Sequence, residues 1–238
     1  VYRIDDYYVF RLNKDYQPSV QTPVKNQIPK RNLKTYWGDI LAKFGNISIV
    51  KNAIGNKKDI VNAGIPFELL TASPYKRKIA MIKSLKIFAK LPQGAYDKVA
   101  KDFVELNKQS DGYRRHFDCN NPNNFIKVGK QIKIVDDISE TYHSPDCYDM
   151  LKVFMKDYNV PMSKNIKKLK RVIFQKCIIA SSKAGLELYP NKMRVELAQL
   201  YPNEFLSDFN SNLQFLDQLP NGKKEFQFKK YFKVLDKQ

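Results

Sequence analysis

The sequence predicts an α+β fold in which a strand-rich N-terminal part precedes a larger helical part. Apolar and polar residues alternate over much of the first 70 residues, as they do in half-buried strands. From Tyr75 onward the apolar residues recur with the period of an amphipathic helix. Hydrophobic residues make up 43% and charged residues 28% of the 238 residues, which is an ordinary globular composition. We therefore expect a folded chain with a substantial core.

The N-terminal part is expected to contain four strands and one helix. Two strands are predicted at residues 1–4 and 7–12, because both stretches are rich in Tyr, Val and Phe. A proline-containing connection follows at 18–30, and the apolar residues of 33–44 then fall on one face at helical spacing. Residues 47–54 and 59–70 alternate like two more strands. Leu33–Phe44 is thus the one helix predicted in this part.

The C-terminal part is expected to be helical apart from one hairpin. Helices are predicted over 75–91 and 96–106, a hairpin at 125–128 and 131–135 around Gly129-Lys130, and a helix that begins at Asp146. Residues 159–238 are predicted to be mostly helical. Apolar stripes there consist of Ile166, Leu169, Ile173, Cys177 and Ala180, and of Met193, Val195, Leu197 and Leu200.

The most informative stretch runs from His116 to Ile138. A polar loop carries Asp118 and Asn123, and the predicted hairpin brings Asp136 back toward the same end. Amide and carboxylate oxygens suit Mg²⁺, and a free carboxylate can orient an attacking hydroxyl. Phosphoryl transfer needs such an arrangement, in which the side-chain oxygens of Asp118, Asn123 and Asp136 meet at one end of the hairpin.

This stretch resembles the catalytic loop and metal-binding segment of the protein-kinase-like superfamily, H-R-D-L-x-x-x-N followed by D-F-G. His116, Asp118 and Asn123 match the His, Asp and Asn of the first motif, and Asp136 matches the Asp of the second. Two departures are that Phe117 replaces the Arg and Asp137-Ile138 replaces Phe-Gly. The compact pattern is most similar to bacterial type III secretion effector kinases.

The resemblance implies a bilobal protein-kinase-like fold. The small β-rich N-lobe would span 1–73, and the larger helical C-lobe would span 74–238 with a catalytic loop at 116–124 and a metal-binding segment at 134–138. The N-lobe is incomplete at its start, because no G-x-G-x-x-G pattern occurs among the nine glycines. The phosphate-covering loop would then precede Val1 or be replaced.

The resemblance also implies ATP with Mg²⁺ or Mn²⁺ as cofactors. Asp118, Asn123 and Asp136 would be catalytic, with Asn123 and Asp136 as the metal ligands. Arg11 or the alternative cation Lys14 would contact the phosphates, and the segment that includes Glu68 and Leu70 would bind adenine through its backbone. Asp39 is the acidic residue in the predicted N-lobe helix, and Asp146 matches an Asp that supports the catalytic loop in kinases or is an ordinary helix cap.

The function expected from this resemblance is ATP-dependent phosphoryl transfer to a protein hydroxyl by an atypical Ser/Thr protein kinase. A secreted bacterial effector would act in the host cell cytoplasm on a host protein substrate; a cytoplasmic location is the other expectation. The alternatives are a small-molecule kinase of the aminoglycoside or choline phosphotransferase type and a catalytically weak kinase-like binding module. Labelled phosphate from ATP would appear on protein for a protein kinase and on metabolites for a small-molecule kinase. A binding module would bind ATP without transferring phosphate.

The net charge of +18 favours an anionic partner, such as an acidic activating protein. Because the basic residues are spread along the chain, a solvated positive surface is expected rather than a nucleic-acid site. No apolar run is long enough to span a membrane. Cys119, Cys147 and Cys177 are odd in number and lack zinc-site spacing, so reduced thiols are expected.

Overall fold

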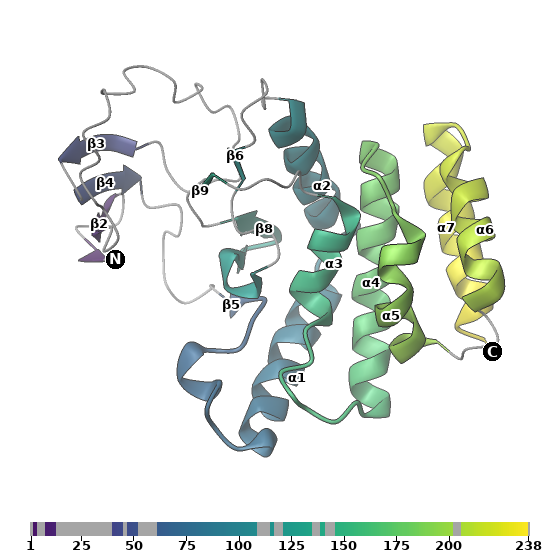
Figure 1. Cartoon of the computed structure of the whole chain (residues 1–238), viewed down its shortest axis with the longest axis horizontal. Helices are drawn as coiled ribbons and strands as arrows, with labels where there is room; N and C mark the ends of the chain where they lie inside the picture. Colours follow the sequence, from purple (N-terminus) through teal and green to yellow (C-terminus); the bar gives the residue numbers. More distant parts are fainter. Residues whose placement is uncertain are drawn as a thin grey trace.

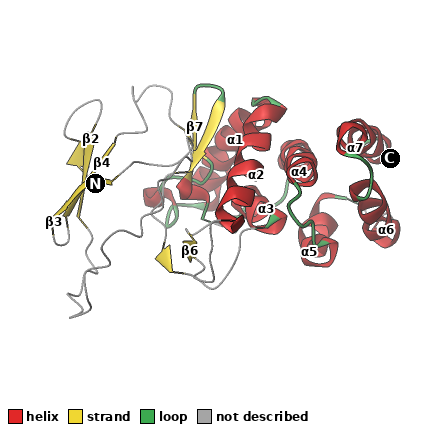
Figure 2. Ribbon diagram, turned by 90° about the horizontal axis from the view of Figure 1, so that it is seen from above, coloured by secondary structure: helices red, strands yellow, loops and turns green. Residues whose placement is uncertain are grey.

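The computed structural model describes residues 2–3, 8–12, 40–44, 47–51, 61–108, 115–116, 121–134, 139–140, 146–201 and 206–237. These residues form an α+β structure with antiparallel sheets and a helical body (Figures 1 and 2). The four-stranded sheet lies to one side of the helical body, beyond the hairpin that precedes α3. The coarse fold class predicted from the sequence is therefore confirmed.

The N-terminal sheet has the strand order β1-β2-β4-β3. Its strands are β1 (Tyr2–Arg3), β2 (Tyr8–Leu12), β3 (Ile40–Phe44) and β4 (Ile47–Lys51), and each neighbouring pair is antiparallel. Strand β2 pairs with β4 along its whole length, from Tyr8 opposite Lys51 to Leu12 opposite Ile47. Aromatic and β-branched residues favour such pairing. The predicted strands at 1–4, 7–12 and 47–54 are thus found, somewhat shorter than expected.

The helix predicted over Leu33–Phe44 is wrong where the structure describes it. Residues 40–44 form β3, which pairs with β4 and has a bulge between Ile40 and Ala42. Gly45-Asn46 separates β3 from β4, and a two-residue Gly-containing spacer between apolar runs is a hairpin signal that outweighs the helical spacing. Residues 33–39, with Asp39, lie outside the described part of the chain.

A second, three-stranded sheet has the order β5-β7-β8. The long strand predicted at 59–70 is reduced to β5 (Val61–Asn62), and the 3-10 helix η2 (Phe67–Leu69) follows it. Pro66 stands immediately before η2, and proline lacks the N–H that a continued central strand needs. The predicted hairpin is confirmed as β7 (Phe125–Val128) and β8 (Gln131–Ile134), with Gly129 at a φ of 57° in the turn. Strands β6 (Arg115–His116) and β9 (Ser139–Glu140) pair with each other.

Seven helices occur in the described part of the chain. They are α1 (Pro74–Lys90), α2 (Gln93–Lys108), α3 (Cys147–Met155), α4 (Lys164–Ala184), α5 (Pro190–Leu200), α6 (Leu206–Asp217) and α7 (Asn221–Leu235). Helix α1 begins with Ser73 as N-cap and Pro74 in its first turn, and it stops before Pro92. Gly185, at a φ of 81°, ends α4 in the left-handed conformation that glycine adopts readily.

Helix α4 is the centre of the helical body. It packs against α1, α2, α3, α5 and α7, and Figures 1 and 2 show helices on both sides of it. Of its predicted apolar stripe, Ile166, Ile173, Cys177 and Ala180 are buried and Leu169 is partly buried. In α5, Met193, Leu197 and Leu200 are buried as predicted, but Val195 is 67% exposed and does not belong to that stripe. Cys147 and Cys177 are both buried free thiols, and Cys119 lies outside the described residues.

Candidate functional site

Asn123 is the predicted catalytic-loop residue whose side chain the structure places. It lies in the 3-10 turn η3 (Pro122–Asn124), just before β7, and its backbone N–H donates to Oδ1 of the N-cap Asn121 at 3.1 Å. Two backbone bonds hold this turn against the segment after β5. Gly64 N–H donates to the Pro122 carbonyl at 3.2 Å, and Ala63 N–H donates to the Phe125 carbonyl at 2.8 Å. The end of the polar loop is therefore anchored on both sides of Asn123.

The side-chain oxygen of Asn123 is buried and has no hydrogen-bond partner among the described residues. An unsatisfied buried amide oxygen costs about 1–3 kcal/mol, a cost that a ligand, a water molecule or a group outside the described residues would offset. Asn123 Oδ1 lies against Gly64, where an added Cβ would be only 2.6 Å away. The amide thus fits beside the segment after β5 only because position 64 has no side chain.

The Tyr158 hydroxyl also lies close to Gly64, next to the contact between Gly64 and the Asn123 side chain. A Cβ at Gly64 would come within 3.0 Å of the Tyr158 hydroxyl, which also makes a hydrogen bond with the backbone of Ile65. Burial raises the pKa of Tyr158 to about 12, so the phenol is neutral at physiological pH. Tyr158 therefore packs behind the Asn123 loop as an uncharged phenol and does not act as a proton acceptor.

Asn123 lines a cavity of about 920 Å³. The other walls come from β5 and the residues after it, from η2, and from one face of α1. The lining residues are Val61, Asn62, Gly64, Pro66, Phe67, Glu68, Leu69, Lys76, Ile79, Ala80, Lys83, Ser84 and Asn123. Six of these residues are apolar, six have polar or charged side chains and one is glycine. The volume of the cavity lies in the range of small-molecule and cofactor sites. We call it the η2–α1 cavity.

Helix α1 is fixed to β5 by a buried serine. Ser84 Oγ lies 2.9 Å from the carbonyl oxygens of both Asn62 and Ala63. Lys76, in the first turn of α1, and Lys83, about two turns later, present two cations to the cavity, against the single carboxylate of Glu68. Neither lysine pairs with a carboxylate in the part of the chain that the structure describes. The charge of the lining therefore favours an anionic ligand.

The structure brings together some of the predicted site residues. Asn123 and Glu68 both line the η2–α1 cavity, whereas Leu70 is not among its lining residues and its carbonyl accepts from Arg77 Nη1 at 3.1 Å. Arg11 is in β2 opposite Ser48, and its side chain lies outside the described part. Asp118, Asp136 and Lys14 also lie outside the described residues. Within the described residues no group of three His, Cys, Asp or Glu side chains is placed to hold a metal ion.

Sequence reasoning missed most of the cavity lining, including Gly64, Lys76, Lys83 and Ser84. Periodicity places the two lysines and Ser84 in the helix predicted over 75–91 and Gly64 in the strand predicted over 59–70. Lys76, Lys83 and the apolar Ile79 recur at helical spacing, so a helix with mixed polarity on one face was the available signal. Gly64 had no comparable signal, because its role depends on a contact with a residue 59 positions later in the chain.

Asp146 is the buried N-cap of α3, as the cap interpretation predicted. Its Oδ1 accepts from Asp149 N–H at 3.1 Å, and the Asp149 side chain accepts from Asp146 N–H at 2.9 Å, which completes a capping box. Its Oδ2 lies 3.1 Å from Lys192 Nζ of α5. Both oxygens are thus engaged by α3 and α5, and support of the catalytic loop by Asp146 stays a prediction.

Comparisons with protein-family models, with curated proteins and with solved structures found no match. The resemblance to kinases therefore rests on the sequence motif alone. Of the helices in the described part of the chain, none combines the length and the apolar character that crossing a bilayer requires.

Proposed function

We propose that this protein transfers the terminal phosphoryl group of ATP to a protein hydroxyl, as an atypical Ser/Thr kinase. One observation carries the proposal: Asn123 of the kinase-like motif opens onto the η2–α1 cavity, together with Glu68 of the segment expected to bind adenine. Two parts of the sequence that the resemblance to kinases assigns to one nucleotide site thus line the same cavity. The bilobal division at residues 1–73 and 74–238 is part of this proposal.

The lining suggests how a nucleotide would be held. The adenine would lie against the apolar wall formed by Phe67, Leu69 and Ile79, where few polar groups compete for it. Lys76 and Lys83 would attract the phosphates from α1, in addition to Arg11 or Lys14 from the N-terminal part. These two α1 lysines are an addition to the set of cations expected from the motif.

The amide of Asn123 suits a Mg²⁺ or Mn²⁺ ion, because its buried oxygen is a hard ligand without a partner among the described residues. Asn123 and Asp136 would hold the ion, which neutralises phosphate charge during transfer. Asp118 would orient the substrate hydroxyl for attack on the terminal phosphorus and accept its proton. His116 belongs to β6 and would support the loop from that strand.

The test is transfer of labelled phosphate from ATP, with Mg²⁺ or Mn²⁺, to proteins of a cell lysate. We expect labelled protein with the unsubstituted chain and loss of at least about a thousandfold in rate for Asp118→Ala and for Asp136→Ala. The control is Glu187→Ala, since Glu187 is exposed and remote from the motif in sequence. Full activity in either Asp variant would remove that residue from its proposed role.

A kinase-like binding module is the second candidate, and the sequence departures favour it. Arg11 stands where the family has a lysine, and an arginine keeps the charge without the compact geometry of an ammonium. A module of this kind would bind ATP and metal but transfer no phosphate. Label that appears on metabolites instead of protein would select the third candidate, a small-molecule kinase.

A further inference from the structure

Helix α4 begins with four cations on one face. Lys164, Lys167, Lys168 and Arg171 follow one another at the i, i+3, i+4 and i+7 positions that share a side of a helix. Together with Val172 and Asp236 they line a pocket of about 350 Å³. We call it the α4 basic pocket. It has no lining residue in common with the η2–α1 cavity.

Arg171 is held in place by groups outside the pocket. Its Nε donates to the Leu200 carbonyl at 2.6 Å, and its guanidinium lies 4.8 Å from the centre of the Tyr201 ring. Such stacking and bonding fix the plane of the guanidinium and leave its terminal nitrogens as donors. Because the guanidinium group of Arg171 is already oriented, binding an anion would cost little side-chain entropy.

The charge of the pocket is poorly compensated. Asp236 is its one carboxylate, and Asp236 Oδ2 already accepts from Gln175 Nε2 at 2.8 Å. No carboxylate within the described ranges forms an ion pair with Lys164, Lys167 or Lys168. The first turn of α4 contains no acidic residue, and these lysines stand at the N-terminal end of α4, which is the positive end of its dipole. The four cations repel one another and the helix terminus, and a bound anion would relieve this repulsion.

We propose that the α4 basic pocket binds a multiply charged phosphate group of a soluble ligand. The planar fork of Arg171 matches phosphate oxygens, and the flexible lysines supply point charges around it. At about 350 Å³ the pocket has room for a compact anion rather than for a length of acidic peptide. The site is separate from the proposed nucleotide cavity and does not depend on that proposal.

The experiment is calorimetric titration of the full chain with sodium tripolyphosphate in EDTA, at low and at physiological salt. EDTA removes divalent ions, so binding through a metal does not contribute. We expect one saturable site whose affinity falls as salt increases. Lys164→Gln/Lys168→Gln should weaken binding by about tenfold or more, since each charge-assisted hydrogen bond contributes substantially. Both lysines are exposed, so the double variant should fold normally.

The matched control is Lys86→Gln/Lys90→Gln on α1. These lysines are also exposed and four residues apart, and the net charge changes equally, so affinity should stay within about twofold. Equal weakening in both variants would mean attraction by net charge and would overturn the proposal. So would weakening confined to Lys76→Gln/Lys83→Gln, because the anion would then occupy the η2–α1 cavity.

Two further probes identify the source of the phosphate. Vesicles with 5% phosphatidylinositol bisphosphate should bind more weakly than tripolyphosphate if the ligand is soluble. Stronger vesicle binding that depends on Lys164 and Lys168 would overturn the soluble source in favour of a lipid headgroup. Poly-glutamate that binds as tightly as tripolyphosphate, with the same dependence on these lysines, would overturn recognition of phosphate altogether.

Discussion

Gly64 and Asn123 form the contact on which the candidate site depends at the scale of single residues. The Asn123 oxygen is buried without a partner among the described residues, and Gly64 leaves the space that this oxygen occupies. The φ angle of Gly64 is not in the left-handed region, so space rather than backbone conformation requires glycine here. The surrounding atoms belong to Pro122 and Tyr158, and neither can move without disturbing η3 or the wall behind it.

Gly64→Ala should therefore destabilise the fold and displace Asn123. A Cβ 2.6 Å from Asn123 Oδ1 and 3.0 Å from two other atoms is overpacking, which costs about 1–3 kcal/mol. Urea unfolding at pH 7 measures this change in the free energy of unfolding. If the proposed function holds, ATP affinity should fall in the same variant, as titration with a fluorescent nucleotide would detect.

Gly94→Ala is the control for this substitution. Gly94 lies in α2, and a Cβ there would meet no atom within 4 Å. Alanine should therefore stabilise the chain by about 0.4–1 kcal/mol through helix propensity and a less flexible unfolded state. If Gly64→Ala proved as harmless as Gly94→Ala, the close contact between Gly64 and Asn123 would be refuted.

Helix α3 is held at both of its ends by buried charged groups. Asp146 and Asp149 form the capping box at its start. At its end, Lys170 of α4 reaches across and donates from Nζ to the carbonyl oxygens of Met155 at 2.7 Å and Lys156 at 3.2 Å. Lys170 is only 1% exposed, so these carbonyls replace the water that its ammonium would otherwise bind. A lysine can satisfy the last carbonyls of a helix in this way.

The cost of burying Lys170 should be visible as a pH dependence of stability. Burial lowers the pKa of Lys170 from 10.5 to about 8, although the carboxylates of Asp157 and Glu196 partly offset it. Between pH 8 and 10.5 the unfolded chain then binds more protons than the folded one, so stability rises with pH. The gain from this group should be about 3 kcal/mol. Below pH 8 the lysine is protonated in both states, and its contribution is constant.

Lys170→Met isolates this contribution, because methionine cannot titrate. The difference in free energy of unfolding, unsubstituted chain minus variant, should increase from pH 8 to pH 10.5 in chemical denaturation. Burial also raises the pKa of Tyr96 and Tyr201, so both proteins should lose stability above about pH 10, and the subtraction cancels that effect. A difference that stays flat across this range would show that the Lys170 pKa is not lowered.

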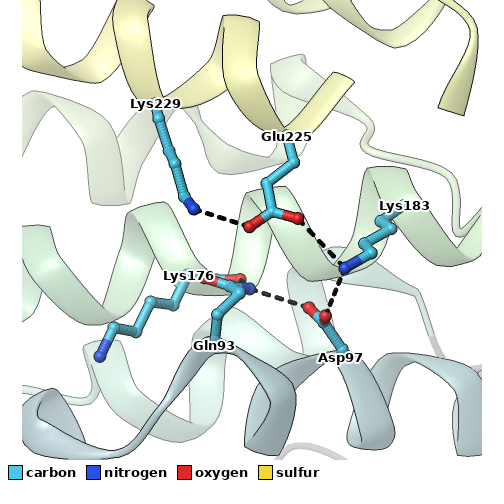
Figure 3. A network of polar contacts seen from close by, with 6 residues as sticks. All are labelled: Gln93, Asp97, Lys176, Lys183, Glu225 and Lys229. Carbon is cyan, nitrogen blue, oxygen red and sulfur yellow. Dashed lines mark hydrogen bonds and ion pairs between the residues drawn. The ribbon is translucent and has the colours of Figure 1, made fainter. Parts of the chain in front are cut away.

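For the whole molecule, α4 also connects the first helices of the body with the last. Figure 3 shows Lys183 of α4 between Asp97 of α2 and Glu225 of α7, with Nζ to carboxylate distances of 2.8 and 3.1 Å. Lys229 approaches Glu225 at 2.7 Å, and Gln93 Nε2 donates to Asp97 Oδ1 at 3.0 Å. Hydrogen bonds from Lys229 and Lys183 lower the pKa of Glu225. Segments more than a hundred residues apart thus share one polar network.

Lys183→Met should reduce the free energy of unfolding by about 1 kcal/mol at pH 7, because Asp97 loses its cation in a largely buried place. Lys229→Met is the control, since this exposed lysine pairs with Glu225 within α7 and should cost only about 0.3–0.5 kcal/mol. Urea unfolding measures both. The lowered pKa of Glu225 means that its stabilising contribution is lost as the pH falls below 4.5. Equal effects of the two substitutions would argue against a network that joins α2 to α7.

The sequence alone predicted the elements whose determinants are local. Periodicity within a few positions predicts the helices from α1 to α5. Turn residues predict the hairpin around Gly129, and a capping residue predicts the start of α3 at Asp146. Residues 40–44 were predicted wrongly because the same apolar spacing suits a helix and a strand, and pairing with β4 decided between them.

For the candidate site, the sequence determined which residue types are present and at what intervals, and it thereby identified Asn123 and Glu68. Only the tertiary structure placed Lys76, Lys83 and Gly64 beside them, because these contacts join parts of the chain that have no local relation in sequence. The same holds for Lys170, whose burial among backbone carbonyls no spacing could indicate. Local rules fix the conformation of each segment, whereas the packing of distant segments decides which side chains lose water and which meet in a cavity.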